Sequence, residues 1–225
     1  MIIYIMKIVN FAESNSVVNK FLSELRDVSI QTDRAKFRYN LQRIGQMMAY
    51  EVSKTLAYSV KSVQTPLGIA EASTHDDSIV LGTIFRAGLP FHQGFLDVFD
   101  GADNAFVSAY RYYRDKECED VGIKIEYMAT PDLNGKTLIV VDPMLATGGS
   151  MELGLEAFCT KGQPAVIHLC SVIASQKGVD YLRTVYGNRT NVTLWCGAID
   201  SELNDHAYIV PGLGDAGDLA YGGKL

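Results

Sequence analysis

The stretch Asp142-Pro-Met-Leu-Ala-Thr-Gly-Gly-Ser150 separates two segments of different character. The apolar run 137–141 before it predicts a buried strand, and residues 151–159 after it are expected to form a helix. A helix start favours a phosphate, because its first N–H groups are unpaired and the helix dipole attracts negative charge. Asp142 follows the strand's carboxyl end, where open α/β sheets bind ligands. The stretch therefore predicts a phosphate site with a carboxylate beside it.

The same nine residues have a simpler interpretation. They could form an ordinary strand-to-helix turn in which Ser150 is the N-cap. Two nucleotide-binding motifs are excluded at this position. The Lys that the nucleoside-triphosphate loop requires does not follow the glycines, and no G-x-G-x-x-G pattern lies at the end of this strand.

Expected strands and helices alternate around this stretch. Strands are expected at 79–85, 105–110, 137–141, 165–174 and 192–196, and helices at 89–99, 151–159 and 176–186. Two more helices, at 17–25 and from Thr32 or Asp33 to a point before Pro66, are expected to precede the first strand. Apolar strands separated by helices predict an α/β fold, with a Rossmann-like parallel sheet covered by helices on both faces.

The composition is that of a soluble globular protein. Of the 225 residues, 48% are hydrophobic and 20% are charged, and the formal net charge is −6. This negative balance argues against a nucleic-acid partner. No apolar run approaches the roughly 20 residues that span a bilayer. Residues 1–6 make a poor signal peptide, so a cytoplasmic location without membrane contact is expected, with Met1 or Met6 as the start.

The chain offers no sign of a division into domains. No linker, repeat or low-complexity tract interrupts it, so one domain is expected over residues 1–225. The alternation at 123–127 suggests a β-hairpin arm at about 112–133, and a small C-terminal hood is expected at about 197–225. The four cysteines lie far apart without a C-x-x-C pair, so neither a disulfide framework nor a zinc site is indicated.

Two motifs together resemble one enzyme family. The stretch 142–150 and the segment Tyr208-Ile-Val-Pro-Gly-Leu-Gly-Asp-Ala-Gly-Asp218 are similar to those of the uracil phosphoribosyltransferases, and Ile84-Phe-Arg-Ala-Gly-Leu89 and Tyr110-Arg111 agree. The resemblance runs from about Lys7 to the C-terminus. It implies the type I phosphoribosyltransferase fold and a reaction of pyrimidine salvage. In that reaction, uracil and 5-phosphoribosyl 1-diphosphate (PRPP) give UMP and diphosphate.

The resemblance also implies which residues bind PRPP. They are Arg86, Arg111, Asp142, Pro143, Met144, Leu145, Ala146, Thr147, Gly148, Gly149, Ser150 and Asp215. Asp142 is expected on the ribose hydroxyls, with a turn-capping role as the alternative. Arg86 and Arg111 each follow an expected strand, and guanidinium groups match diphosphate oxygens, although either could be a surface ion-pair residue. Gly88 is expected to let the backbone approach the ligand.

The C-terminal motif is expected to bind the base. The resemblance implies that Ile209, Gly214, Asp215 and Ala216 contact uracil, and the glycines permit turns that present backbone N–H and C=O groups to a flat polar ring. Asp142, Arg111 and Asp215 are the expected catalytic residues. Mg²⁺ is the implied cofactor, held mainly by PRPP and water with no metal ligands of the protein's own. The family often has a basic residue after Asp218, whereas this chain has Leu219.

Other functions remain open on the sequence alone. A regulator with the same fold could bind RNA and sense UMP or PRPP, but the net charge and the lack of a Lys/Arg-rich stretch disfavour it. A transferase for a purine or orotate is the other alternative, and orotate would need a cation near Gly214. The resemblance implies a homodimer or larger homo-oligomer. The sequence leaves open its size and whether GTP is an effector.

Overall fold

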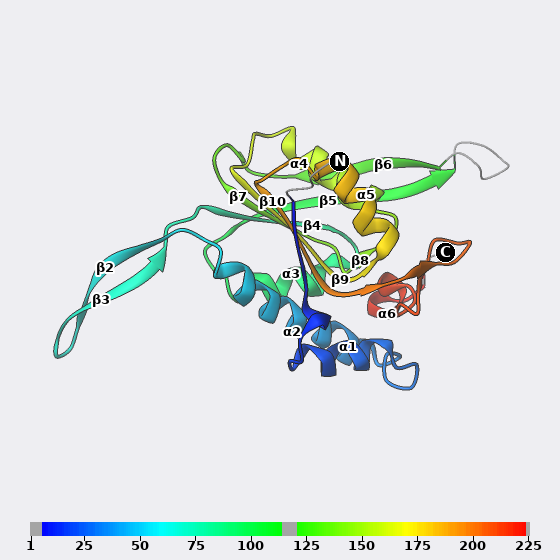
Figure 1. Ribbon diagram of the computed structural model, residues 1–225, viewed down its shortest axis with the longest axis horizontal. Helices are drawn as coiled ribbons and strands as arrows, with labels where there is room; N and C mark the ends of the chain where they lie inside the picture. The colour runs from blue at the N-terminus through cyan, green and yellow to red at the C-terminus, as the bar shows by residue number, and fades with distance from the viewer. Residues whose placement is uncertain (1–5, 114–120, 224–225) are drawn as a thin grey trace.

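The chain is built around one mostly parallel sheet (Figure 1). The computed structural model describes residues 6–113 and 121–223, with side chains at 109–113 and 121–125 excluded. The strand order is β1-β10-β9-β7-β4-β5-β6, and β8 pairs with β9. Only β6 runs antiparallel to its neighbour. The strands are β1 (Lys7–Asn10), β4 (Ile79–Phe85), β5 (Asp103–Tyr113), β6 (Val121–Ala129), β7 (Thr137–Val141), β8 (Met144–Leu145), β9 (Val166–Ser175) and β10 (Val192–Asp200).

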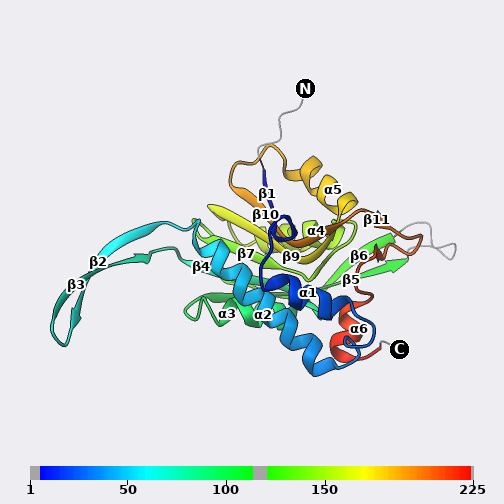
Figure 2. The same ribbon diagram turned by 60° about the horizontal axis from the view of Figure 1, so that its bottom comes forward.

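Helices cover both faces of this sheet (Figure 2). One face carries α4 (Gly149–Cys159) and α5 (Gln176–Tyr186), and the other carries α1 (Val18–Arg26), α2 (Arg34–Ser53) and α3 (Gly88–Leu96). All five residues of β7 are buried because this central strand is covered on both sides. The predicted α/β fold is confirmed.

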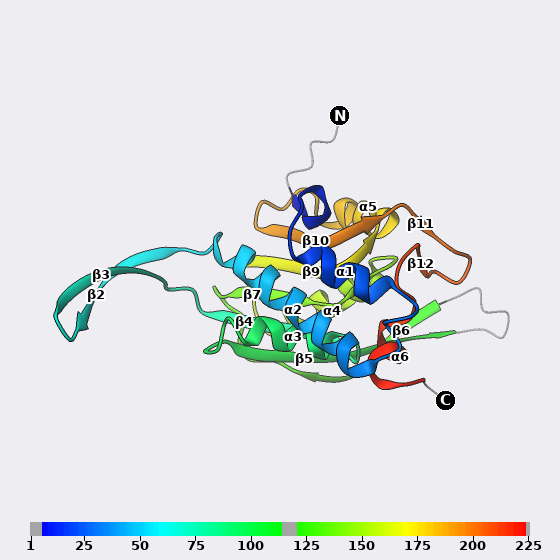
Figure 3. The same ribbon diagram turned by 90° about the horizontal axis from the view of Figure 1, so that it is seen from below.

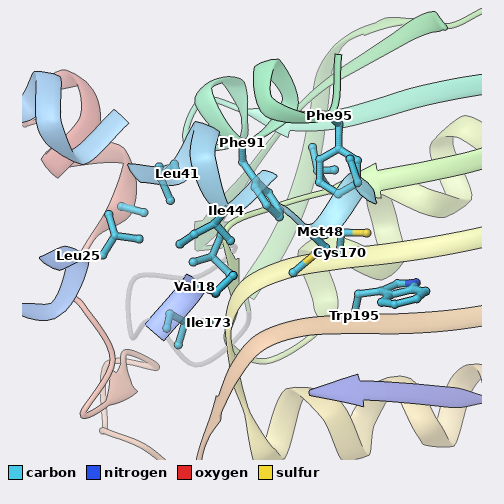
Figure 4. Packing of buried hydrophobic residues seen from close by; sticks show 14 of the residues in the cluster. Val18, Leu25, Leu41, Ile44, Met48, Phe91, Phe95, Cys170, Ile173 and Trp195 are labelled. Atoms are coloured by element: carbon cyan, nitrogen blue, oxygen red, sulfur yellow. The ribbon is translucent and has the colours of Figure 1, made fainter. Parts of the chain in front are cut away.

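The larger of two apolar cores lies between the sheet and α1, α2 and α3 (Figure 4). Ile44 and Met48 of α2 pack with Phe91 and Phe95 of α3, and Trp195 of β10 closes the far side. Gly45 lets the two helices approach, since a Cβ there would lie 2.5 Å from the backbone oxygen of Phe91. The second core lies under α4 and α5. The sheet is therefore held rigidly from both sides.

The long helix begins where the sequence predicts it and ends before Pro66, as expected. The Asp33 carboxylate caps α2 by accepting hydrogen bonds from the backbone N–H groups of Ala35 and Lys36. The helix ends at Ser53. The chain then forms a hairpin of β2 (Tyr58–Thr65) and β3 (Gly68–His75), a separate two-stranded sheet that the sequence did not indicate. It projects from the end of the molecule opposite α6 (Figure 3).

Two further differences concern strands. The prediction that two helices precede the first strand is wrong, because the short β1 comes before them and pairs in parallel with β10. The predicted arm is confirmed as an antiparallel hairpin of β5 and β6, which begins earlier than expected because β5 also pairs with β4. Residues 114–120, which include the charged part of the predicted arm and Cys118, lie outside the described residues.

The C-terminal segment folds against the end of the sheet that holds the β5–β6 hairpin (Figures 1 and 3). It contains β11 (Glu202–Leu203), β12 (Ile209–Val210), which pair in an antiparallel manner, and α6 (Ala216–Tyr221). A short 3-10 helix, η1 (Phe11–Glu13), follows β1. Among the helices in residues 6–113 and 121–223, none has the length and apolar character needed to cross a membrane.

Candidate active site

The first half of the stretch 142–150 is an extension of the sheet. The N–H of Asp142 donates to the backbone oxygen of Cys170 at 3.1 Å, and the oxygen of Pro143 accepts hydrogen bonds from two residues of β9. Met144 and Leu145 then pair with β9 as β8. Asp142 Oδ1 accepts a hydrogen bond from Met144 N at 3.3 Å. The backbone around Asp142 is thus fixed by the neighbouring strand.

The second half of the stretch forms the start of α4. The helix begins at Gly149, with Gly148 as its N-cap in the left-handed conformation (φ 90°). The simpler interpretation, in which Ser150 caps the helix, is wrong because Ser150 lies inside the first turn. A glycine has no side chain that could cap the helix start. No side-chain hydrogen bond from the N-cap closes the start of α4, where the sequence predicts a phosphate.

Residues of β9 and α5 support this loop, and the sequence did not indicate them. The hydroxyl of Ser175 donates to the backbone oxygen of Ala146 at 2.5 Å and accepts from Gly178 N at 2.9 Å. A Cβ on Gly178 would lie 2.6 Å from the oxygen of Ala146, so only glycine allows this close packing. The tyrosine at 181 donates a hydrogen bond from its hydroxyl to Glu152 in the first turn of α4, which raises the pKa of Tyr181.

Arg86 follows β4 directly, as predicted, and lies at the same edge of the sheet as Asp142. Its guanidinium donates to the Asp218 carboxylate at 2.5 Å and to the backbone oxygen of Gly222 at 3.0 Å. Arg86 therefore connects the β4 edge to α6. The expected role of Gly88 differs: a Cβ there would lie 2.2 Å from Thr83 Oγ1, so this glycine serves the packing of α3 on the sheet.

Arg111 occupies a different position from the predicted one. It lies within β5, opposite Ile123 of β6, because the strand continues to Tyr113. The prediction that Arg111 follows a strand end is wrong for this reason. Its side chain lies outside the described residues.

The expected base-binding residues lie together between β12 and α6. Ile209 and Ala216 are buried in the larger core, so they offer the site only their backbone groups. Gly214 has a positive φ of 93°. Asp215 is the N-cap of α6, and its Oδ1 accepts a hydrogen bond from Asp218 N at 2.9 Å. Asp218 also binds Arg86, so α6 connects the base-binding segment to the carboxyl end of β4.

A buried ion pair anchors this segment to the rest of the molecule. Both terminal nitrogens of Arg26, on α1, donate to the Asp200 carboxylate at 2.7 and 2.8 Å. Arg26 also donates to the backbone oxygen of Gly212 at 2.9 Å, and Gly212 N donates to Asp200 at 2.9 Å. The partners are 174 and 186 residues from Arg26 in sequence, so no local pattern could have identified them.

A cavity of about 600 Å³ lies between the start of α4, the start of α5 and the C-terminal segment. Thr147 and Lys177 form one side, and residues 201–205 and 207 form the other. Of the described residues expected to bind PRPP or uracil, Thr147 is the one that lines this open depression. Lys177 is a cation on its wall that the sequence analysis missed. Within the described part of the chain, no cluster of three or more His, Cys, Asp or Glu side chains is arranged to hold a metal ion.

Comparisons with known proteins show the family of this chain. The family model for uracil phosphoribosyltransferase matches residues 12–223. A uracil phosphoribosyltransferase of Porphyromonas gingivalis is 56% identical over 220 residues, which cover 98% of this chain and 100% of the relative. One from Methanothermobacter thermautotrophicus is 39% identical and is covered over 93% of its length, against 92% of this chain.

A solved structure also resembles the whole fold. The AQ2163 protein from Aquifex aeolicus superposes with a TM-score of 0.83 at 31% identity, covering 97% of this chain and 99% of that protein. This chain therefore shares its overall fold with a solved protein over nearly the whole length of both. The family match spans the carboxyl ends of the strands, the start of α4 and the C-terminal segment, where the candidate site residues lie. This chain belongs to the uracil phosphoribosyltransferase family.

Proposed function

We propose that this chain transfers the phosphoribosyl group of PRPP to uracil, which yields UMP and diphosphate and salvages a pyrimidine. The start of α4 beside Asp142 carries the proposal, because a helix start that lacks a side-chain cap favours a phosphate, and a carboxylate at the same end of the sheet suits a ribose. The 56% identity with a uracil phosphoribosyltransferase supports uracil as the base.

The PRPP site extends along this edge. Residues 146–150 bind the 5′-phosphate through backbone N–H groups and hydroxyls, Asp142 binds the ribose hydroxyls, and residues 143–145 hold the loop on the sheet. Arg86 and Arg111 neutralise the diphosphate. Because Arg86 binds Asp218 in this structure, PRPP must compete with that carboxylate or share the guanidinium with it. Asp215 lies next to both ligands, through its position at the start of α6.

Uracil occupies the turn before α6. Gly214, Asp215 and Ala216 present backbone groups to the edge of the ring, and Ile209 supports the turn from the core. Paired hydrogen bonds to the O4 and N3–H groups reject cytosine, whose 4-amino group would meet another donor.

The reaction requires positioning and charge stabilisation more than covalent catalysis. The N1 atom of uracil attacks C1′ as the bond from C1′ to the diphosphate oxygen breaks. Diphosphate leaves with the bonding electrons, and the N1 proton of uracil passes to water. The C1′ carbon develops positive charge in between, as in other glycosyl transfers. Asp142 and Asp215 are the carboxylates at this site that can stabilise that charge, and the arginines stabilise the leaving group.

Mg²⁺ suits the donors available at this site. Mg²⁺ prefers hard oxygen ligands, which diphosphate and water supply, and the carboxylates of Asp142 and Asp215 add negative charge nearby. When bound, the ion neutralises negative charge on the leaving diphosphate. We propose that PRPP and water hold it and that the protein provides no dedicated set of ligands.

The assembly and location of the enzyme belong to the same proposal. We propose one domain over residues 1–225 with a cytoplasmic location, and a homodimer or larger assembly in which the exposed β2–β3 hairpin contributes contacts. Addition of GTP to the assay tests whether this nucleotide is an effector. Light scattering of the purified protein and fractionation of cells test assembly and location.

A direct assay tests the reaction. Purified protein is incubated with PRPP, Mg²⁺ and one free base at a time, and diphosphate release is measured. Turnover is expected with uracil and not with cytosine, hypoxanthine or orotate. No turnover with uracil, or faster turnover with another base, would contradict the proposal and would favour the alternatives of an RNA-binding regulator or a different transferase.

Two variants test the assigned residues. Asp215→Asn and Arg111→Ala are expected to lower kcat/KM by about 100-fold, which corresponds to about 3 kcal/mol of lost transition-state stabilisation. Asp132→Asn is the matched control, because this exposed residue precedes β7 and lies toward the opposite edge of the sheet. Near-normal kinetics in both test variants would refute the site assignment.

A further inference from the structure

Tyr181 lies against the loop that begins α4. A Cβ built on Gly148 would come within 2.5 Å of Tyr181 Cδ1, so the tyrosine ring covers this glycine closely. Gly148 has a positive φ of 90° and is the N-cap of α4. The ring therefore occupies the space beside the residue whose conformation directs the first N–H groups of the helix.

The hydroxyl of Tyr181 contacts the first turn of α4. It donates a hydrogen bond to the carboxylate of Glu152, the acidic residue in the first turn of α4. The N–H of Glu152 in turn donates to the backbone oxygen of Gly148 at 3.0 Å. One side chain of α5 thus contacts both the cap and the first turn of α4.

The charge of Glu152 gives this contact a consequence for anion binding. A carboxylate in the first turn is attracted to the same N–H groups and dipole that attract a phosphate, and it repels a phosphate that arrives there. A hydrogen bond from a neutral hydroxyl to a carboxylate is charge-assisted and holds the carboxylate in one orientation. The hydrogen bond to Glu152 also raises the pKa of Tyr181 above its ordinary value of 10.

We propose that Tyr181 is a positioning residue for PRPP. Its ring fixes Gly148, and its hydroxyl draws the Glu152 carboxylate toward α5, so that this carboxylate does not compete with the 5′-phosphate. This role rests on the proposed function, which assigns the phosphate to residues 146–150. It extends the site beyond the two motifs of the family resemblance to a residue of α5.

Tyr181→Phe tests the hydroxyl while keeping the ring. We expect the KM for PRPP to rise about five-fold, with kcat and the KM for uracil changed by less than two-fold, because only the phosphate site is affected. Tyr50→Phe is the matched control: it removes the hydroxyl of an exposed tyrosine of α2 that packs on Lys54. Thermal unfolding of both variants shows whether the fold is intact.

Glu152→Gln separates the charge effect from a structural one. In this background no carboxylate remains to be held, so the double variant Glu152→Gln/Tyr181→Phe is expected to have the same KM for PRPP as Glu152→Gln alone. A merely structural tyrosine would lower the unfolding temperature and leave the KM for PRPP unchanged. That result, or equal effects of Tyr181→Phe in both backgrounds, would overturn the proposal.

Binding of ribose 5-phosphate provides a readout besides activity. Calorimetry is expected to give a dissociation constant about five-fold weaker for Tyr181→Phe than for the unaltered protein. If the unaltered protein binds ribose 5-phosphate but does not convert uracil, the proposed function fails and these dissociation constants decide the role of Tyr181 alone. Equal affinities in the unaltered protein and the variant would refute that role.

Discussion

At the scale of single residues, the site depends on how closely two backbone segments approach. Gly178 of α5 lies against the loop after Asp142, where a Cβ would be 2.6 Å from the oxygen of Ala146 and 2.9 Å from that of Leu145. Both neighbours are backbone atoms, which cannot move aside as a flexible side chain can. A small change at this position must therefore displace the phosphate loop or α5.

Gly178→Ala is expected to lower the free energy of unfolding by about 1–3 kcal/mol, the usual cost of overpacking, and to raise the KM for PRPP. Thermal unfolding and steady-state kinetics measure the two effects. Gly68→Ala is the control, because a Cβ there meets nothing within 4 Å. Equal stability of the two variants would show that the loop and α5 are not tightly packed.

A second residue-scale feature is the buried imidazole of His168. Its Nδ1 accepts a hydrogen bond from Trp195 Nε1 at 3.1 Å, and its Nε2 has no partner among the described residues. Burial lowers the pKa of His168 from 6.5 to about 4, although the negative charge of Asp77 opposes this shift. The folded protein therefore keeps His168 neutral at pH values where the unfolded chain binds a proton.

The sign of the pH effect follows from this difference. The stability that His168 contributes is complete above pH 6.5 and is lost as the pH falls towards about 4, where the folded protein also binds the proton. The loss is about 3 kcal/mol. The free energy of unfolding can be measured with urea at pH 7.5 and 4.5. Its decrease between these two pH values should be smaller in His168→Gln than in the unaltered protein, by about this amount. An unchanged pH dependence would contradict the prediction.

At the scale of elements, α1 determines where the base-binding segment lies. Arg26 is 25% exposed and Asp200 is 8% exposed, so their ion pair is largely removed from water. Arg26 also binds Gly212, just before the turn that we assign to uracil. The C-terminal segment is therefore attached to the first helix and, through Arg86, to β4.

Arg26→Met is expected to lower the free energy of unfolding by about 2–4 kcal/mol, because a mostly buried carboxylate loses its partner. The KM for uracil should rise more than the KM for PRPP, since the change loosens the base-binding turn. Denaturant unfolding and separate saturation curves measure these effects. In the control Lys54→Met, the exposed pair with Glu51 is lost, and the expected change is below about 1 kcal/mol. Similar losses in both variants would refute the anchoring role.

At the scale of the whole molecule, the β2–β3 hairpin stands out because its exposed apolar side chains have no obvious role in a single chain. It forms a separate two-stranded sheet at the end opposite α6. Its apolar side chains face solvent, with Leu67 fully exposed and Ile69 73% exposed. An isolated two-stranded hairpin is only marginally stable in water. Contact with a second copy of the chain would cover these side chains.

Ile69→Lys is therefore expected to weaken self-association by at least ten-fold, which light scattering over a range of protein concentrations measures. Val28→Lys is the control, since Val28 is 79% exposed in the loop between α1 and α2. A monomeric unaltered protein, or equal association of both variants, would show that the hairpin is not an interface.

The sequence predicted the elements whose pattern is local and strong. The apolar strands β4, β7 and β9 and the helices α4 and α5 are where their periodicity placed them, because buried strands and helices impose their spacing on neighbouring residues. The β2–β3 hairpin escaped prediction because its largely exposed strands lack the alternation that burial on one face imposes. The short β1 escaped because four residues carry too little pattern.

The sequence by itself determined the α/β fold and the family, because strand–helix alternation and the two motifs are written in adjacent residues. Only the tertiary structure decided which distant groups support the site. Ser175 and Gly178 bind the loop after Asp142, and Arg86 joins Asp218 across 132 residues. Contacts between residues so far apart depend on how the chain folds back on itself, and no local pattern of side chains encodes them.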